Sequence, residues 1–129
     1  MRRGLWFLVP VLLVAVPACR HAQKDGETTK PTPVRLPVQV EVKNNFALPA
    51  EIFVVASGTS QRLGTVHPGM RAHYTIPPGL TGNGSVVIEA RASSTNQVGR
   101  SGPLLLSSGA IVDFQVAEQL FNSTATIRP

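Results

Sequence analysis

The stretch Val38-Gln39-Val40-Glu41-Val42-Lys43 decides the fold class, because apolar and polar side chains alternate along it without a break. Successive side chains of a strand point to opposite faces, so the three valines would face a core and the polar residues solvent. A second segment, residues 51–56, is mostly apolar, as expected of a strand buried on both faces. Together the two segments predict a β-domain.

Turn residues recur about every ten positions after this stretch, which favours a sandwich. We therefore predict an all-β fold with one antiparallel β-sandwich of about seven strands over residues 38–129. The predicted strands are residues 38–43, 51–56, 62–66, 71–76, 85–90, 103–106 and 111–116, with 123–127 as an eighth strand at an edge. Residues 77–84 and 92–102 are predicted loops, and residues 116–121 are too short to predict a helix.

The N-terminal residues have the layout of an export signal. Arg2 and Arg3 supply a positive start, and residues 5–16 carry no charge. A transmembrane helix needs ~20 apolar residues, and this run is much shorter and is interrupted by Pro10. We predict a signal peptide over residues 1–18.

The end of this signal, Val16-Pro17-Ala18-Cys19, resembles the lipobox of bacterial lipoproteins. The resemblance implies cleavage between Ala18 and Cys19 and attachment of diacylglycerol and palmitate to the Cys19 thiol. Val16 and Ala18 also suit an ordinary signal peptidase, so a secreted chain without lipid is the alternative.

Cys19 is the only cysteine of the chain. An intrachain disulfide and a cysteine metal cluster are therefore excluded, and the fold must rest on its own core. Two or three acyl chains would anchor the protein durably to a membrane. Arg20, rather than aspartate, follows the cysteine, which favours the outer membrane or cell surface over the inner membrane.

Residues 19–37 are predicted to form a flexible tether after the lipidated cysteine. They hold mixed charges and three prolines and almost no large apolar side chain. Such a segment cannot bury enough surface to offset chain entropy. Its expected role is that of a spacer between anchor and domain.

The basic charge gives no support for nucleic-acid binding. The formal net charge is +5, but Arg2 and Arg3 belong to the signal, and the rest of the chain has ten basic against seven acidic residues. These are spread along the chain without interleaved aromatic residues. We expect no nucleic-acid partner.

Catalytic and metal-binding patterns are weak. A metal site would need His67 and His73 with Glu89 or Asp113, at a spacing that matches no recognised ligand pattern. A Ser-His-Asp triad could be composed of Ser85, His73 and Asp113. The sequence lacks the Gly-x-Ser-x-Gly elbow that would support such a triad. We therefore predict a protein that is not an enzyme, with no cofactor and no metal.

The run Arg62-Leu63-Gly64-Thr65-Val66-His67-Pro68-Gly69 follows an apolar strand and precedes a Tyr-Thr-Ile-Pro strand. In this setting it resembles small β-domains of bacterial lipoproteins. Their architecture is similar to immunoglobulin-like or transthyretin-like sandwiches. The resemblance implies a fold and no activity.

The leading functional hypothesis is a non-enzymatic binding or structural module of the cell envelope, with an envelope protein as partner. Loops on a rigid β-scaffold usually carry binding. The connections at residues 44–49, 67–70 and 92–102 would share the end of the sandwich that faces away from the membrane. The candidate partner-facing residues in these loops are Phe46, Met70, Asn96, Val98 and Arg100.

The alternative is an accessory subunit that binds its partner by strand pairing. Residues 38–43 and 123–128 lie at the ends of the domain sequence, and both are expected at sheet edges. An open edge accepts an added strand. A proline at Gln39 would then block the partner.

Overall fold

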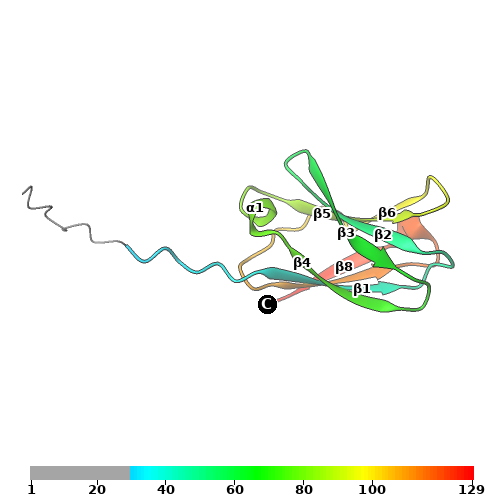
Figure 1. The fold of residues 1–129 in the computed structure, drawn as a ribbon, viewed down its shortest axis with the longest axis horizontal. Helices are drawn as coiled ribbons and strands as arrows, with labels where there is room; N and C mark the ends of the chain where they lie inside the picture. The colour runs from blue at the N-terminus through cyan, green and yellow to red at the C-terminus, as the bar shows by residue number, and fades with distance from the viewer. Residues whose placement is uncertain (1–29) are drawn as a thin grey trace, which may run out of the picture. The chain divides into compact units, whose positions relative to one another are not determined.

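Eight strands form two four-stranded sheets that pack face to face (Figure 1). The computed structural model describes residues 30–129, and residues Pro33–Pro129 form one unit that holds all the strands. The elements in chain order are β1 (Val38–Asn44), β2 (Ala50–Ala56), β3 (Thr59–Val66), β4 (Arg71–Ile76), α1 (Pro78–Thr81), β5 (Val86–Ala92), β6 (Val98–Arg100), β7 (Ile111–Val116), η1 (Leu120–Asn122) and β8 (Thr124–Arg128).

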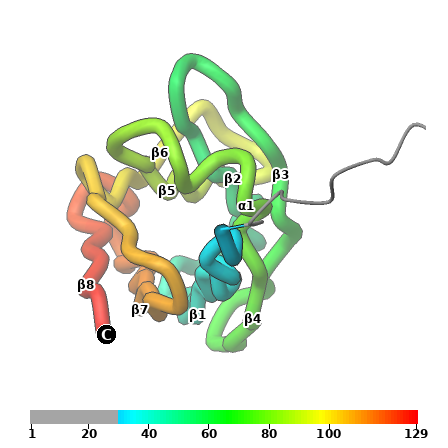
Figure 2. The backbone as a smooth tube through the Cα atoms, turned by 90° about the vertical axis from the view of Figure 1, so that its left-hand side faces the viewer, coloured from blue at the N-terminus to red at the C-terminus, as the bar shows by residue number. Residues whose placement is uncertain are grey.

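The first sheet, sheet A, has the strand order β4-β1-β7-β8, and the second, sheet B, has the order β3-β2-β5-β6. Figure 2 shows the two sets of strands as separate layers. β1 pairs with β7 in parallel, with Val40 opposite Val112, and every other strand pair is antiparallel. The prediction of a purely antiparallel sandwich is therefore wrong at the centre of sheet A. A parallel pair needs a long connection, and here all of β2 to β6 lies between the partners.

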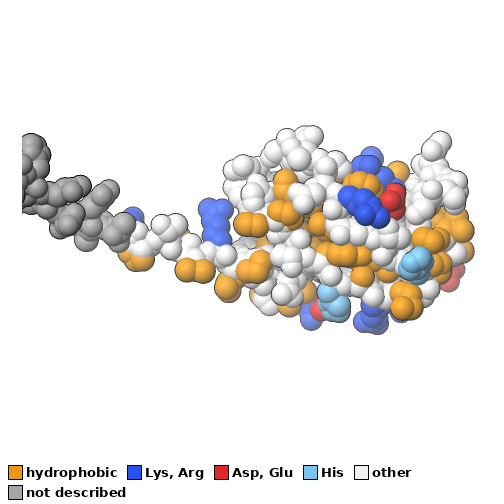
Figure 3. All heavy atoms as spheres, viewed as in Figure 1, with side chains coloured by type: hydrophobic (Ala, Val, Ile, Leu, Met, Phe, Trp, Pro, Cys, Tyr) orange, Lys and Arg blue, Asp and Glu red, His pale blue; other side chains and the backbone are white. Residues whose placement is uncertain are grey.

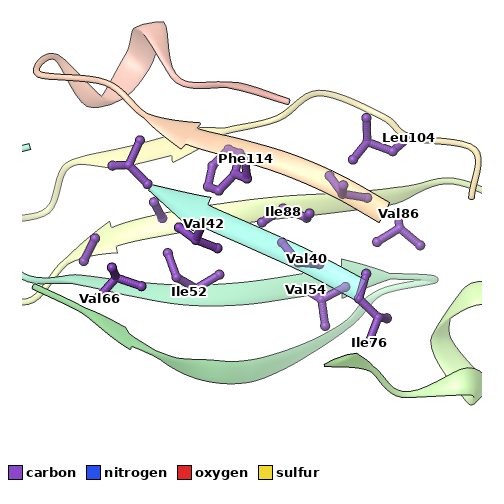
Figure 4. Packing of buried hydrophobic residues seen from close by; sticks show 14 of the residues in the cluster. Val40, Val42, Ile52, Val54, Val66, Ile76, Val86, Ile88, Leu104 and Phe114 are labelled. Carbon is purple, nitrogen blue, oxygen red and sulfur yellow. The ribbon is translucent and has the colours of Figure 1, made fainter. Parts of the chain in front are cut away.

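Alternation along the strands builds the core. Val38, Val40 and Val42 of β1 are buried, while Gln39 is exposed. The opposite layer supplies Ile52, Val54 and Ile88, and Figure 4 shows these side chains pointing between the sheets toward Phe114 of β7. Burial of each such side chain stabilises the fold by roughly 1.5–3 kcal/mol before entropy is counted. The alternating valines thus have the predicted role.

One predicted strand is absent and another was missed. Residues 103–106 form only an isolated bridge, between Leu104 and Val86, since Gly102 has a positive φ and Pro103 lacks an N–H for a ladder. Instead β6 runs through residues 98–100, inside the predicted loop 92–102. Three residues are too few to show a period of two in the sequence.

Two short helical turns replace predicted irregular segments. α1 lies in the loop predicted over residues 77–84 and begins at Pro78, whose fixed φ suits a first helical position. η1 lies near the end of the stretch 116–121. β8 is the edge strand predicted over residues 123–127.

β3 and β4 lie at neighbouring edges of the two sheets, and one aromatic ring covers the space between them. The Tyr74 ring lies so close to Gly64 that a Cβ there would stand 2.6 Å from it. The Tyr74 hydroxyl donates to the Thr65 carbonyl at 3.3 Å. Burial raises the pKa of this phenol, and nearby Arg62 opposes that rise in part. Position 64 requires glycine because the Tyr74 ring of β4 occupies the space that a side chain on β3 would need.

Residues 30–37 have no regular secondary structure and are exposed, and the rest of the predicted tether lies outside the described residues. The end of this segment is nonetheless attached to the domain, because the Leu36 N–H donates to the Ser108 hydroxyl at 2.7 Å. No helix within residues 30–129 combines the length and the apolar character needed to span a membrane.

Candidate functional site

Four connections meet at one end of the sandwich, on the right in Figure 1. They are residues 45–49, 67–70, 93–97 and 117–123, and we call this end the loop end. The opposite end, where residues 33–37 join β1, is called the proximal end. The predicted grouping of residues 44–49 and 67–70 is confirmed, but only the first half of 92–102 lies there, since β6 runs back toward the proximal end.

Asn44 holds the loop end together. Its side chain is fully buried, and its Nδ2 donates to the carbonyls of Leu48 and Val66, both at 2.9 Å. Its Oδ1 accepts from the Phe46 N–H at 2.9 Å. The Asn44 backbone also exchanges hydrogen bonds with the turn at Gly69 and Met70. One asparagine thereby ties the β1–β2 connection to the β3–β4 turn.

The fourth connection, 117–123, packs directly on β6. A Cβ on Gly99 would lie 2.4 Å from the Leu120 carbonyl oxygen and 2.6 Å from the Ser123 hydroxyl. That hydroxyl accepts from the Ala117 N–H at 3.1 Å, which closes the connection on itself. Leu120 is 2% exposed, whereas its neighbour Phe121 is 76% exposed. The short helical turn therefore buries one side chain and presents the next to solvent.

A groove of about 530 Å³ lies between these connections. Phe46, Val98, Leu120 and Phe121 supply its apolar surface. Gln97, Glu118 and Gln119 supply polar groups. An apolar surface with a few polar groups at its margin is the usual form of a surface that receives a partner side chain.

The predicted partner-facing residues are not all in this groove. Phe46 and Val98 line it. Met70 is 59% exposed in the β3–β4 turn, and Asn96 is exposed in the β5–β6 turn. Arg100 lies on the outer face of sheet B, where its Nε donates to Glu89 at 2.8 Å. A role for any of them in binding stays a prediction.

Sequence reasoning missed Phe121, Leu120 and Glu118. For residues 116–121 the sequence predicts only that the segment is too short for a helix. The sequence feature that indicates this surface is the pair Leu120-Phe121 in a short polar segment between two strands. One of two adjacent large apolar side chains in such a turn must face away from the core.

The outer face of sheet B carries an ion-pair cluster above an aromatic ring. Glu89 is 7% exposed and accepts from both Arg91, at 2.8 Å, and Arg100, at 2.8 Å. Burial tends to raise the pKa of Glu89, but the hydrogen bonds from the two arginines outweigh it and lower that pKa. The Arg91 guanidinium also lies 4.0 Å from the centroid of the Phe53 ring.

The outer face of sheet A carries a second charged cluster. Arg128 contacts Asp113 at 2.5 Å and Glu41 at 3.1 Å, and His73 lies 3.8 Å from Glu41. The hydrogen bonds from Arg128 lower the pKa of Asp113. A shallow cleft of about 430 Å³ lies over this cluster. In Figure 3 a cluster of charged side chains lies at the upper right of the domain and others lie along its lower margin, with hydrophobic side chains between them.

The weighed metal and hydrolase sites are not assembled. His73 and Asp113 line the cleft on sheet A. Glu89 lies on β5 of sheet B, Ser85 immediately precedes that strand, and His67 lies in the β3–β4 turn. Within residues 30–129 no three His, Cys, Asp or Glu side chains gather as a metal ion would need. The predicted cleavage site at Ala18 and lipid attachment site at Cys19 lie outside the described residues.

No protein-family model matches the chain, and no curated protein matches it. A similar solved structure is the NMR structure of a protein from Eubacterium rectale. It is 13% identical, the match covers 74% of this chain and 92% of that chain, and the TM-score is 0.45. A likeness at this level carries no inference about activity.

Proposed function

We propose that this protein is a lipid-anchored module of the bacterial cell envelope that binds a protein partner through its loop end and performs no catalysis. The groove at Phe46 and Phe121 carries the proposal. Phe121 is 76% exposed, and contact of this apolar side chain with water costs free energy. A partner that covers the side chain would recover that free energy. The buried Asn44 network holds the adjoining connections in place, which lowers the entropy cost of binding.

The anchor part of the proposal rests on the sequence at Cys19. Its direct test is the intact mass of the protein from membranes of its host, beside a Cys19→Ala variant. A chain that begins at Cys19 and carries diacylglycerol supports the anchor. An unmodified soluble chain would contradict it and leave the secreted alternative.

The sandwich type also belongs to the proposal. The sequence resembles immunoglobulin-like or transthyretin-like domains, and we favour the transthyretin-like type. In immunoglobulin constant domains the first strand pairs with the second. Here β1 pairs with β4 and β7 instead. A measured structure with β1 beside β2 would contradict this assignment.

The groove is tested by site-specific crosslinking in host membranes. A photoreactive residue at Gln119 should yield a defined crosslinked product, and Phe46→Ser with Phe121→Ser should remove it. The control is Val34→Ser, an exposed apolar position outside the groove. A product that survives the groove substitutions, or that the control also removes, would contradict groove binding.

Strand pairing is the second candidate, and one observation favours it. β8 is an edge strand, and its Ile127 is 41% exposed. The other predicted edge, residues 38–43, is wrong because β1 lies between β4 and β7. A proline at Gln39 would therefore break the centre of sheet A and could not discriminate the two hypotheses.

Ile127→Lys is the better test of strand pairing, since lysine on an edge strand opposes added strands. It should remove the crosslinked product under the strand-pairing hypothesis and leave it intact under groove binding.

A further inference from the structure

Exposed large hydrophobic side chains gather at the proximal end. Among the described residues six such side chains are exposed, and only Met70 and Phe121 lie at the loop end. The other four are Val34, Leu36, Leu105 and Ile127, exposed by 86%, 60%, 77% and 41%. The segments that carry them, residues 33–37, 101–110 and the end of β8, all lie where the chain joins β1.

Backbone hydrogen bonds keep the side chains of Leu36 and Leu105 exposed to solvent. Leu104 exchanges two backbone hydrogen bonds with Val86, at 2.8 and 2.9 Å, and is buried. This fixes the chain so that the next residue, Leu105, faces solvent. Leu36 is likewise clamped, because its N–H donates to Ser108 and its carbonyl accepts from the Gly109 N–H at 3.1 Å. Their exposure is thus built into the fold.

The connections at the proximal end carry no acidic residue. The connections at residues 57–58, 77–85 and 101–110 contain no charged residue. Residues 33–37 carry Arg35 and no acid, and Arg128 at the end of β8 is paired with Asp113 and Glu41. The loop end differs, because Glu118 lies in its groove. Exposed apolar side chains beside a basic residue, with no acid in the neighbouring connections, are a composition that favours adsorption to anionic lipid.

We propose that the proximal end docks on an anionic phospholipid surface through Leu36 and Leu105, with Arg35 against the headgroups. The inference rests on the proposed membrane anchor, since that anchor would precede this end of the domain in sequence. Docking holds the domain against the bilayer, so the loop end with its groove points away from the membrane. The apolar surface then adds to the attachment that the acyl chains would provide.

The test uses the mature chain, residues 19–129, with Cys19→Ser, so that no lipid or signal contributes. Its flotation is measured with vesicles of phosphatidylcholine, with and without phosphatidylglycerol. We expect binding to the anionic vesicles only. Leu36→Ser with Leu105→Ser should weaken it by about tenfold or more, and Arg35→Gln should reduce both the binding and its sensitivity to salt.

The matched control is Met70→Ser with Phe121→Ser, which removes the two exposed apolar side chains of the loop end. This variant should float like the parent, and amide NMR spectra should show that all variants are folded. The proposal is overturned if the parent ignores anionic vesicles or if the control pair loses binding as the leucine pair does. Failure of lipidation at Cys19 would be detected separately by intact mass. It would not affect the flotation assay, because the assayed chain carries no lipid.

Discussion

The two ends of the sandwich are built in opposite ways. At the loop end a fully buried asparagine, Asn44, bonds three neighbouring backbone groups, and Gly99 lets the 117–123 connection pack on β6. At the proximal end Leu36 is attached by exposed bonds, from its N–H to the Ser108 hydroxyl and from the Gly109 N–H to its carbonyl. Buried polar networks are costly to break, whereas exposed bonds exchange readily with water. The comparison predicts a more rigid loop end and a looser proximal end.

The sharpest way to break this contrast is Asn44→Ala. The substitution leaves the carbonyls of Leu48 and Val66 and the Phe46 N–H without their partner. We expect a loss of about 3–5 kcal/mol in the free energy of unfolding, measured by urea denaturation. Asn96→Ala, on an exposed asparagine of the same end, should change it by less than about 0.5 kcal/mol. Equal losses in the two variants would remove the basis for calling the loop end rigid.

Gly99→Ala should have the next largest effect. The added Cβ would lie 2.4 Å from the Leu120 carbonyl, so the 117–123 connection must move away from β6. We expect about 1–3 kcal/mol of destabilisation and altered NMR shifts around the groove. Gly79→Ala is the control, because a Cβ there meets nothing within 4 Å. Unchanged shifts at Leu120 and Phe121 would contradict the packing described.

Glu89→Gln tests the middle of the molecule, between the two ends. Because the arginines lower its pKa in the folded state, Glu89 adds stability above the ordinary pKa of 4.5. That contribution disappears as the pH falls through the lowered value. At neutral pH the variant should lose on the order of 1 kcal/mol. Denaturation across acidic pH should show the difference between the two proteins shrinking, and a constant difference would contradict the ion pairs.

The smallest effect is expected at the proximal end. Ser108→Ala removes the hydroxyl that accepts from the Leu36 N–H, but water can replace it. The free energy of unfolding should fall by less than about 1 kcal/mol. Hydrogen exchange at Leu36 should nonetheless accelerate. A loss as large as that of Asn44→Ala would show that the two ends are equally rigid.

Much of the fold could be read from the sequence where side chains alternate. The valines of β1 and the apolar run of β2 identified core strands. The expectation that β2 is buried on both faces is wrong, because its residues alternate between buried and partly exposed and only one face of its sheet meets the core. The parallel pairing of β1 with β7 could not be read, since two similar strands do not reveal their order in a sheet. β6 was missed because Gly99 interrupts its three residues.

The candidate site was predicted less completely. Phe46 and Val98 were chosen because they lie in connections, and both line the groove. Phe121 was missed because its exposure depends on Leu120 filling the core, which only the packing against Gly99 decides. Arg100 was assigned to a loop, whereas β6 carries it to the outer face of sheet B.

The place of β1 at the centre of sheet A also has a kinetic consequence. Gln39 pairs with Ile111, so the first strand must wait for one of the last before its sheet can close. Contacts of such long range slow folding, because a large loop must be ordered before they form. A chain threaded through a membrane from its N-terminus would expose β1 while its partner was still on the other side. In an exported chain the topology would therefore delay folding until nearly the whole domain had crossed.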